Sequence, residues 1–266
     1  MMYLGIVGAE TPLAKVVLEQ IKQHKEEYRV CFMADASYKG AKSEVKYADA
    51  DSALLMVPAT LVLDFSENEE EAYQNAKFYA EYHVPAILTT PLSEDKIELL
   101  EAYRKARYSV PALLIEPNLS FNRAMLIEQA ALVLKTLGRD VEQVVVNCKY
   151  PADKAFDIEP YMPLIKRLNQ ALGLTEWKSG PVCHNSRRYE QQIGFVQMRL
   201  EKYFAGQDTL QITIKFHGSC VELHESSSAD DIWRGIEALM AYAVDYGAST
   251  GEVMTAVLPK LVKRYW

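Results

Sequence analysis

Residues 2–14 read MYLGIVGAETPLA, and this stretch decides the fold. Its first part, Tyr3–Val7, is a short apolar run that ends at Gly8, which is typical of a buried strand before a tight turn. Thr11 then precedes Pro12, a pair that suits a helix N-cap followed by proline at the first helical position. Apolar residues continue beyond it at helical spacing. The chain therefore opens with a strand, a tight turn and a helix.

The same alternation continues through the first 120 residues. We expect further strands at 28–34, 59–65, 86–89 and 112–116, with helices over 67–82 and from residue 93. The segment 36–53 is small and charged, and we expect loop and short surface elements there. Alternating strands and helices predict a parallel sheet with right-handed crossovers and helices on both faces. The sequence thus predicts an α/β protein whose N-terminal domain, residues 1–120, is a Rossmann-like parallel sheet.

The pattern changes after Asn118. We expect helices over 121–137 and 163–172, strands over 141–148, 192–200 and 209–223, and final helices over 229–246 and 251–263. Nearby strands without a helix between them favour antiparallel pairing. Residues 121–228 are therefore expected to form a second, α+β domain with a mixed or antiparallel sheet.

Composition limits the class of protein. Apolar residues make up 49% and charged residues 24% of the 266 residues, as in ordinary soluble globular proteins. The formal charge of −7 argues against a broad surface for nucleic acid or for an anionic membrane, because both require a basic face. No apolar run reaches the roughly eighteen residues of a membrane span, and no basic segment precedes the first strand. We therefore expect a cytoplasmic protein that binds neither nucleic acid nor a membrane.

The four cysteines, Cys31, Cys148, Cys183 and Cys220, lie far apart and form no CxxC pair. Such a scattered set predicts reduced, mostly buried thiols rather than disulfides or a metal site. No other metal-ligand spacing stands out, so no metal is expected.

The turn after the first strand departs from the usual dinucleotide fingerprint, GxGxxG. Only Gly8 remains; Glu10 stands where a missing side chain normally lets the phosphate approach, and Pro12 removes an N–H donor. An ordinary β–α turn is the simpler alternative. Asp35 favours a nucleotide, because it ends the second strand at the place where an acid binds the ribose diol. It also favours NAD over NADP, since a 2′-phosphate would meet a like charge.

Several strand ends supply small and polar residues, where open α/β sheets bind their ligands. These segments are DFS at 64–66, TTP at 89–91 and EPNLS at 116–120. With the turn and the second strand, the expected cofactor-binding residues are Gly8, Thr11, Asp35, Phe65, Ser66, Thr89, Thr90 and Asn118.

Six short motifs occur in the order found in the dihydrodipicolinate reductases of lysine biosynthesis, and the chain resembles that family over nearly its whole length. They are LDFS at 63–66, LTTP at 88–91, PNLS at 117–120, IGF at 193–195 followed by Arg199, HESSS at 224–228, and Gly235. The resemblance implies NAD(H)- or NADP(H)-dependent reduction of a small cyclic imine dicarboxylic acid. It also implies that the C-terminal helices within 229–266 join the nucleotide domain, and that the second domain builds a homotetramer through its sheet.

The family's catalytic signature, E-[AL]-H-H-x-x-K-x-D-x-P-S-G-T-A, is not kept. The matching residues 146–160 read VNCKYPADKAFDIEP, without histidine and without the Ser-Gly-Thr turn. Lys149 and Lys154 are the candidate proton donors, with ordinary loop lysines as the alternative. Asp157 and Glu159 replace the substrate-binding turn and would repel a dicarboxylate.

Arg187 and Arg188 are candidate substrate-binding residues in a polar loop, because arginine binds carboxylate or phosphate in a fork geometry. A solvated basic loop is the alternative. Three functions remain open: a reductase of this family, a reductase for a different substrate, or a catalytically inactive member with a binding or regulatory role.

Overall fold

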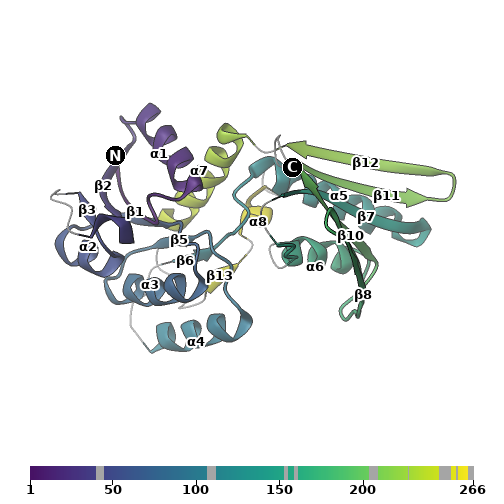
Figure 1. The fold of residues 1–266 in the computed structure, drawn as a ribbon, viewed down its shortest axis with the longest axis horizontal. Coiled ribbons are helices and arrows are strands. Elements are labelled where there is room, and N and C mark those ends of the chain that lie inside the picture. The colour runs from purple at the N-terminus through teal and green to yellow at the C-terminus, as the bar shows by residue number, and fades with distance from the viewer. Residues whose placement is uncertain are drawn as a thin grey trace. The chain divides into compact units, whose positions relative to one another are not determined.

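The computed structural model describes residues 1–39, 45–106, 112–152, 155–158, 161–203, 209–226, 228–245, 253–255 and 257–262. The chain divides into two units. The first unit consists of Met1–Leu119 and Ile232–Leu258, and the second of Ser120–Asp231 and Pro259–Trp266 (Figure 1).

The first unit is built on a parallel sheet with the strand order β13-β6-β5-β4-β1-β2-β3. Its strands are β1 (Met2–Val7), β2 (Tyr28–Ala34), β3 (Lys46–Tyr47), β4 (Leu61–Asp64), β5 (Ala86–Leu88), β6 (Leu113–Ile115) and β13 (Val253–Thr255). The central strands are mainly apolar, and all four residues of β4, including Asp64, are buried, as expected where both faces of a sheet are covered. The strand order reverses at β1, because β2 and β3 extend the sheet on one side of it and β4 to β6 on the other.

The helices of this unit are α1 (Pro12–Gln23), the short 3-10 helix η1 (Ala36–Tyr38), α2 (Ala50–Met56), α3 (Glu69–Glu81), α4 (Glu94–Lys105) and, from Ile232 onward, α7 (Ala229–Asp245). Thr11 caps α1 as the sequence predicts, since its Oγ1 accepts a hydrogen bond from the Ala14 N–H at 3.3 Å. Trp233 of α7 stacks on His24 and meets Tyr28 edge to face. A β-carbon on Gly235 would collide with the Leu119 carbonyl, so a glycine is required for this approach.

The second unit contains a mixed sheet with the strand order β12-β11-β7-β10-β9-β8. Its elements are α5 (Phe121–Leu137), η2 (Gly138–Asp140), β7 (Val141–Pro151), α6 (Met162–Ala171), β8 (Ser179–His184), β9 (Arg188–Ile193), β10 (Val196–Tyr203), β11 (Thr209–Phe216) and β12 (Ser219–Ser226). The pair of β7 and β10 is parallel, and the other neighbours are antiparallel. The short helix α8 (Leu258–Val262) follows β13 in the chain.

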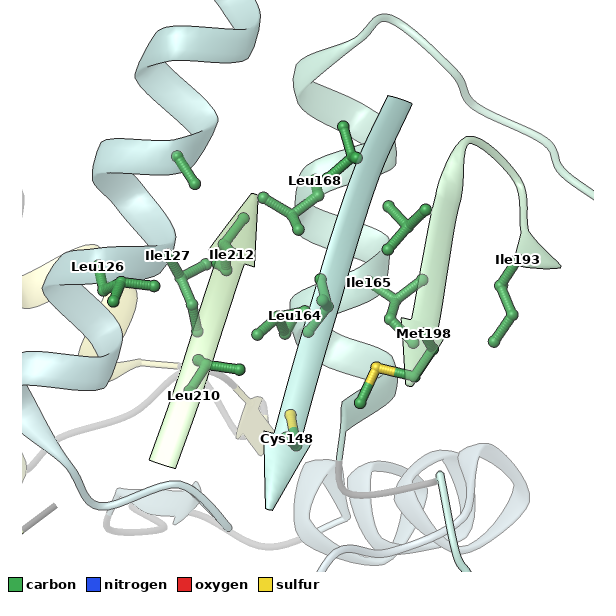
Figure 2. Packing of buried hydrophobic residues seen from close by; sticks show 14 of the residues in the cluster. Leu126, Ile127, Cys148, Leu164, Ile165, Leu168, Ile193, Met198, Leu210 and Ile212 are labelled. Atoms are coloured by element: carbon green, nitrogen blue, oxygen red, sulfur yellow. The ribbon is translucent and has the colours of Figure 1, made fainter. Parts of the chain in front are cut away.

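One face of this mixed sheet carries the hydrophobic core of the second unit. Figure 2 shows Leu126 and Ile127 of α5, and Leu164, Ile165 and Leu168 of α6, beside the inward side chains of the strands. Alternate residues of β7, such as Val144, Val146 and Cys148, lie in this core. The predicted fold class, a Rossmann-like parallel sheet with a second domain around a mixed sheet, is confirmed.

The short elements expected within 36–53 are η1, β3 and the start of α2, which Asp49 caps by accepting from the Ser52 N–H at 2.7 Å. Other sequence-based expectations need correction. The helix expected over 251–263 is wrong at its start: Val253–Thr255 pairs with β6 as an edge strand, and among the described residues of this stretch the helix is Leu258–Val262. The predicted strands near 192–200 and 209–223 each span a hairpin, with turns at Gly194 and Gly218, whose φ angles are positive.

The cysteines are less buried than expected. Cys148 is buried and Cys31 is intermediate, but Cys183 and Cys220 are exposed. These two lie on β8 and β12, the edge strands of the mixed sheet, where fewer neighbours cover a side chain. Among the described residues, no cluster of His, Cys, Asp or Glu is arranged to hold a metal ion. No helix in the described parts of the chain is both long and apolar enough to span a membrane.

Candidate functional site

The candidate site lies at the carboxyl ends of the parallel strands in the first unit. Open α/β sheets bind ligands at the point where the strand order reverses, which here is the junction of β1 with β4. Most predicted cofactor residues follow these ends: Gly8 after β1, Asp35 after β2, Phe65 and Ser66 after β4, and Thr89 and Thr90 after β5. The structure therefore brings them to one edge of one sheet.

Gly8 joins the first turn to the end of β4. Its φ is +66°, and a β-carbon built on it would lie 2.7 Å from the Phe65 carbonyl carbon and oxygen and 2.9 Å from the Ser66 nitrogen. Both the backbone conformation and the space exclude a side chain. The turn therefore keeps the one glycine of the fingerprint that this close approach requires.

The backbone N–H groups of the turn are mostly satisfied within the protein. The acceptors are the Ala34 carbonyl for Gly8 and Ala9, the Asp35 carboxylate for Glu10, the Gly8 carbonyl for Thr11, and Thr11 Oγ1 for Ala14. Because Pro12 has no N–H, Leu13 carries the remaining donor of this turn, and no described residue accepts from it. An anion at the start of α1 would therefore meet the Leu13 N–H and the positive end of the helix dipole.

The Glu10 side chain turns to two partners. Its Oε1 accepts a hydrogen bond from the Tyr38 hydroxyl at 2.5 Å, and its Oε2 lies 3.0 Å from Lys15 Nζ. The Tyr38 hydrogen bond, followed by Lys15, lowers the pKa of Glu10, which is therefore ionised at neutral pH. The negative charge that the sequence places in this turn is paired with a lysine.

Asp35 is held ready as an acceptor after β2. Its Oδ1 accepts from the Ser37 N–H at 2.9 Å and from the Ser37 hydroxyl at 2.7 Å, and its Oδ2 accepts from the Glu10 N–H at 3.1 Å. Burial alone would raise the pKa of Asp35, but these hydrogen bonds outweigh it and hold the pKa below its ordinary value. An ionised carboxylate at this strand end is the chemistry that binds a ribose diol.

A buried network fixes the ends of β4 and β5. The Asp64 carboxylate is 1% exposed and accepts from the Tyr79 hydroxyl at 2.6 Å, from Asn75 Nδ2 at 3.1 Å and from the Ser66 N–H at 2.8 Å. The Thr90 hydroxyl donates to the Ser66 carbonyl, and the Thr89 hydroxyl donates to the Asp64 carbonyl at 3.2 Å. The expected residues of these loops are thus held rigidly.

Sequence reasoning missed the helical members of that network. Asn75 and Tyr79 lie four residues apart on α3, which places both on one helical face. The sequence signal for this pair was a polar residue followed four positions later by a tyrosine on a predicted helix. At the end of β6, Glu116 accepts from the Leu258 N–H at 2.9 Å, and Asn118 is partly buried.

The predicted lysine and arginines of the second unit lie elsewhere in the fold. Lys149 alternates with buried Cys148 on β7, so it projects from the sheet face opposite the core, and its Nζ lies 3.0 Å from Glu201 Oε2. Arg188 approaches the same glutamate at 3.6 Å. Arg187 is exposed in the polar turn between β8 and β9, as predicted, whereas Arg188 is the first residue of β9. Lys154 lies outside the described residues.

A second buried polar cluster belongs to the second unit, and two of its residues, Ser120 and Glu225, lie in the PNLS and HESSS motifs. The Ser120 hydroxyl contacts Asp231 Oδ2 and, at 3.1 Å, Glu225 Oε1. Asp231 Oδ1 accepts from the Asn122 N–H at 2.7 Å, and Glu225 Oε2 accepts from Arg123 Nε at 3.0 Å. Ser120 and Asp231 are the first and last residues of the main segment of this unit. Their contact therefore joins the two ends of that segment.

Comparison with known proteins supports the fold and leaves the family open. No protein-family model matches the chain, and no curated protein sequence is similar to it. Among solved structures, the dipicolinate-bound dihydrodipicolinate reductase from Paenisporosarcina sp. TG-14 is similar, with a TM-score of 0.68 and 11% identity over 97% of this chain and 98% of that one.

Two inositol enzymes are similar at the same level. Scyllo-inositol dehydrogenase from Lactobacillus casei, with bound NAD(H) and scyllo-inositol, has a TM-score of 0.63 and 10% identity over 98% of this chain and 94% of that one. Myo-inositol 2-dehydrogenase from Lactobacillus plantarum has a TM-score of 0.66 and 7% identity over 98% and 93%. The chain therefore has the two-domain fold that these oxidoreductases share.

Proposed function

We propose that this protein is an oxidoreductase that uses NAD(H) and acts on a small molecule. The observation that carries the proposal is Asp35: an ionised carboxylate at the end of β2, bonded to the backbone of the β1–α1 turn at the point where the strand order reverses. The similar reductase and dehydrogenases, one of them with bound NAD(H), support the same reading.

The residues of the edge fit a dinucleotide. Asp35 would accept the ribose hydroxyls, and the Leu13 N–H with the start of α1 would face the pyrophosphate. Gly8 keeps the space beside Phe65 free of a side chain, and Ser66, Thr89 and Thr90 would border the rest of the cofactor. When bound, the nicotinamide supplies or accepts the hydride.

For the substrate, we propose a small cyclic imine dicarboxylic acid of the dihydrodipicolinate type, because the motifs resemble that family and the similar reductase matches this chain over nearly the whole of both chains. A different substrate is the second candidate. Exposed Asp157 stands where that family carries its carboxylate-binding turn, and an alcohol does not meet the same repulsion. The inositol dehydrogenases among the similar structures favour this second candidate.

The proton donor stays a prediction between Lys149, Lys154 and water. The Lys149 ammonium forms an ion pair with Glu201. Comparing Lys149→Met with Glu201→Gln therefore distinguishes a catalytic lysine from a lysine that only stabilises the fold through this pair. A catalytic lysine loses kcat only in the first variant, whereas a purely structural pair gives the same result in both. We also propose a cytoplasmic homo-oligomer, which light scattering on the purified chain tests for assembly.

The function is tested by titrating NADH and NADPH while protein fluorescence is followed, and then by assaying hydride transfer at 340 nm. The assays use dihydrodipicolinate with NADH, and scyllo- and myo-inositol with NAD. Turnover of dihydrodipicolinate confirms the first substrate; nucleotide binding with turnover of an inositol alone favours the second. Binding without any turnover points to the inactive alternative, and no binding at millimolar nucleotide overturns the proposal. Asp35→Asn is expected to weaken binding, and Asp95→Asn, an exposed carboxylate on α4, serves as the control.

A further inference from the structure

The turn carries an ion pair that the dinucleotide fingerprint does not require. Glu10 Oε2 lies 3.0 Å from Lys15 Nζ, and the two side chains are 42% and 59% exposed. Lys15 belongs to the first turns of α1, so its backbone is fixed by a capped helix. The Tyr38 hydroxyl holds the other oxygen of Glu10. Both ends of this carboxylate are thereby occupied.

This ion pair lies beside the carboxylate expected to bind the ribose. The Glu10 N–H donates to Asp35 Oδ2 at 3.1 Å, so the backbone of Glu10 touches Asp35 directly. Tyr38 is the last residue of η1, and Asp35 is the N-cap of that short helix. The Lys46 ammonium lies 4.4 Å from the centre of the Tyr38 ring. The charge of Lys15 also contributes to lowering the pKa of Asp35, which places the ammonium within electrostatic reach of that carboxylate.

A 2′-phosphate on the adenosine ribose distinguishes NADP from NAD, and it needs a cation at this place. Lys15 is a cation bonded into the turn, but Glu10 already binds it. Removing the charge of Glu10 would release the lysine and also remove one negative charge from the surroundings of the phosphate.

We propose that Glu10 is a specificity-determining residue, which favours NAD(H) over NADP(H) by holding Lys15 away from a 2′-phosphate. Tyr38 is a positioning residue, because its hydroxyl fixes the Glu10 carboxylate against the lysine. The inference rests on the proposed function and adds a second determinant to Asp35. An unphosphorylated ribose needs no cation here, so the affinity for NADH depends little on Glu10.

The test measures dissociation constants of NADH and NADPH for the full chain and four variants. Glu10→Gln is expected to lower the ratio of the NADPH to the NADH constant by about tenfold, through tighter NADPH binding. The double variant Glu10→Gln with Lys15→Met is expected to restore the original ratio. Tyr38→Phe is expected to shift the ratio in the same direction as Glu10→Gln, but less. Glu19→Gln is the control, since Glu19 forms a more exposed pair with Lys22 on the same helix.

The outcomes separate the two proposals. If NADH binds and the ratio is the same in the unmodified chain and in Glu10→Gln, this inference is overturned while the proposed function stands. A shift in Glu10→Gln that persists in the double variant also overturns it, because the lysine then plays no part. If neither nucleotide binds the folded unmodified chain, the proposed function fails and this inference fails with it.

Discussion

Gly8 and Phe65 approach so closely that a β-carbon on the glycine would lie 2.7 Å from the Phe65 carbonyl carbon. The contact fixes the β1–α1 turn against the end of β4, and it combines with a positive φ that disfavours other residues. We expect Gly8→Ala to lower the free energy of unfolding by about 3 kcal/mol, from strain and overlap together.

Urea unfolding measures that change. Gly173→Ala is the matched control, because Gly173 also has a positive φ but a β-carbon there would meet nothing within 4 Å. It is expected to cost about 1 kcal/mol from the backbone conformation alone. Equal losses in the two variants would contradict the close approach of Gly8 to β4.

Tyr79 holds the buried Asp64 carboxylate that orders the loop after β4. Tyr79→Phe is expected to cost about 2 kcal/mol, because a buried carboxylate loses a donor that water does not replace. Tyr82→Phe removes a similar bond, to Asp51 at 2.8 Å, from a more accessible position, and it is expected to cost less than about 1 kcal/mol. Chemical denaturation compares the two, and an equal cost would show that the Asp64 network is open to solvent.

Most of the fold could be predicted from the alternation of apolar strands with helices. The run at Tyr3–Val7, the Thr11–Pro12 start of α1 and the long helix Phe121–Leu137 were all readable, because propensity, capping and burial agree there. Strand β8 was not readable, since most of its residues are exposed and show no alternation. Strand β13 was misread as helix because its three residues gain their pairing only from β6, far away in the sequence.

Some residues of the candidate site could likewise be predicted from the sequence, and others could not. Gly8 and Asp35 stood at positions that a known turn geometry specifies, so the sequence alone placed them. The roles of Tyr38, Lys15 and Asn75 depend on which side chains the loops bring together, and no spacing rule fixes such contacts. The same holds for Ser120 with Asp231, which are over a hundred residues apart.

Glu225 is buried with Arg123 in the second unit, and their side chains are 3% and 13% exposed. Glu225→Gln removes the negative charge that pairs with the Arg123 guanidinium, and we expect a loss of about 3 kcal/mol of unfolding free energy. Glu222→Gln on the same strand changes an exposed glutamate near His224 and is expected to cost under about 0.5 kcal/mol. Thermal or urea unfolding that finds the two variants alike would show the Arg123 pair to be solvated.

The lowered pKa of Asp35 makes stability depend on acid pH. The folded pKa lies below the ordinary value of 3.8, so the stabilisation is fully present above that value and is lost as the pH falls through the folded pKa. Asp35→Asn removes this contribution, and its unfolding free energy is expected to fall less between pH 7 and pH 3 than that of the unmodified chain. A variant that loses as much as the unmodified chain over this range would contradict the hydrogen bonding of Asp35 to Ser37 and Glu10.

The central claim is that the carboxyl edge of the parallel sheet binds a nicotinamide dinucleotide, and a crystal structure grown with excess NADH tests it most directly. The account predicts ribose hydroxyls on the Asp35 carboxylate and the pyrophosphate beside Gly8 at the start of α1. An edge that stays empty at millimolar NADH, or a nucleotide bound away from Asp35, would contradict it.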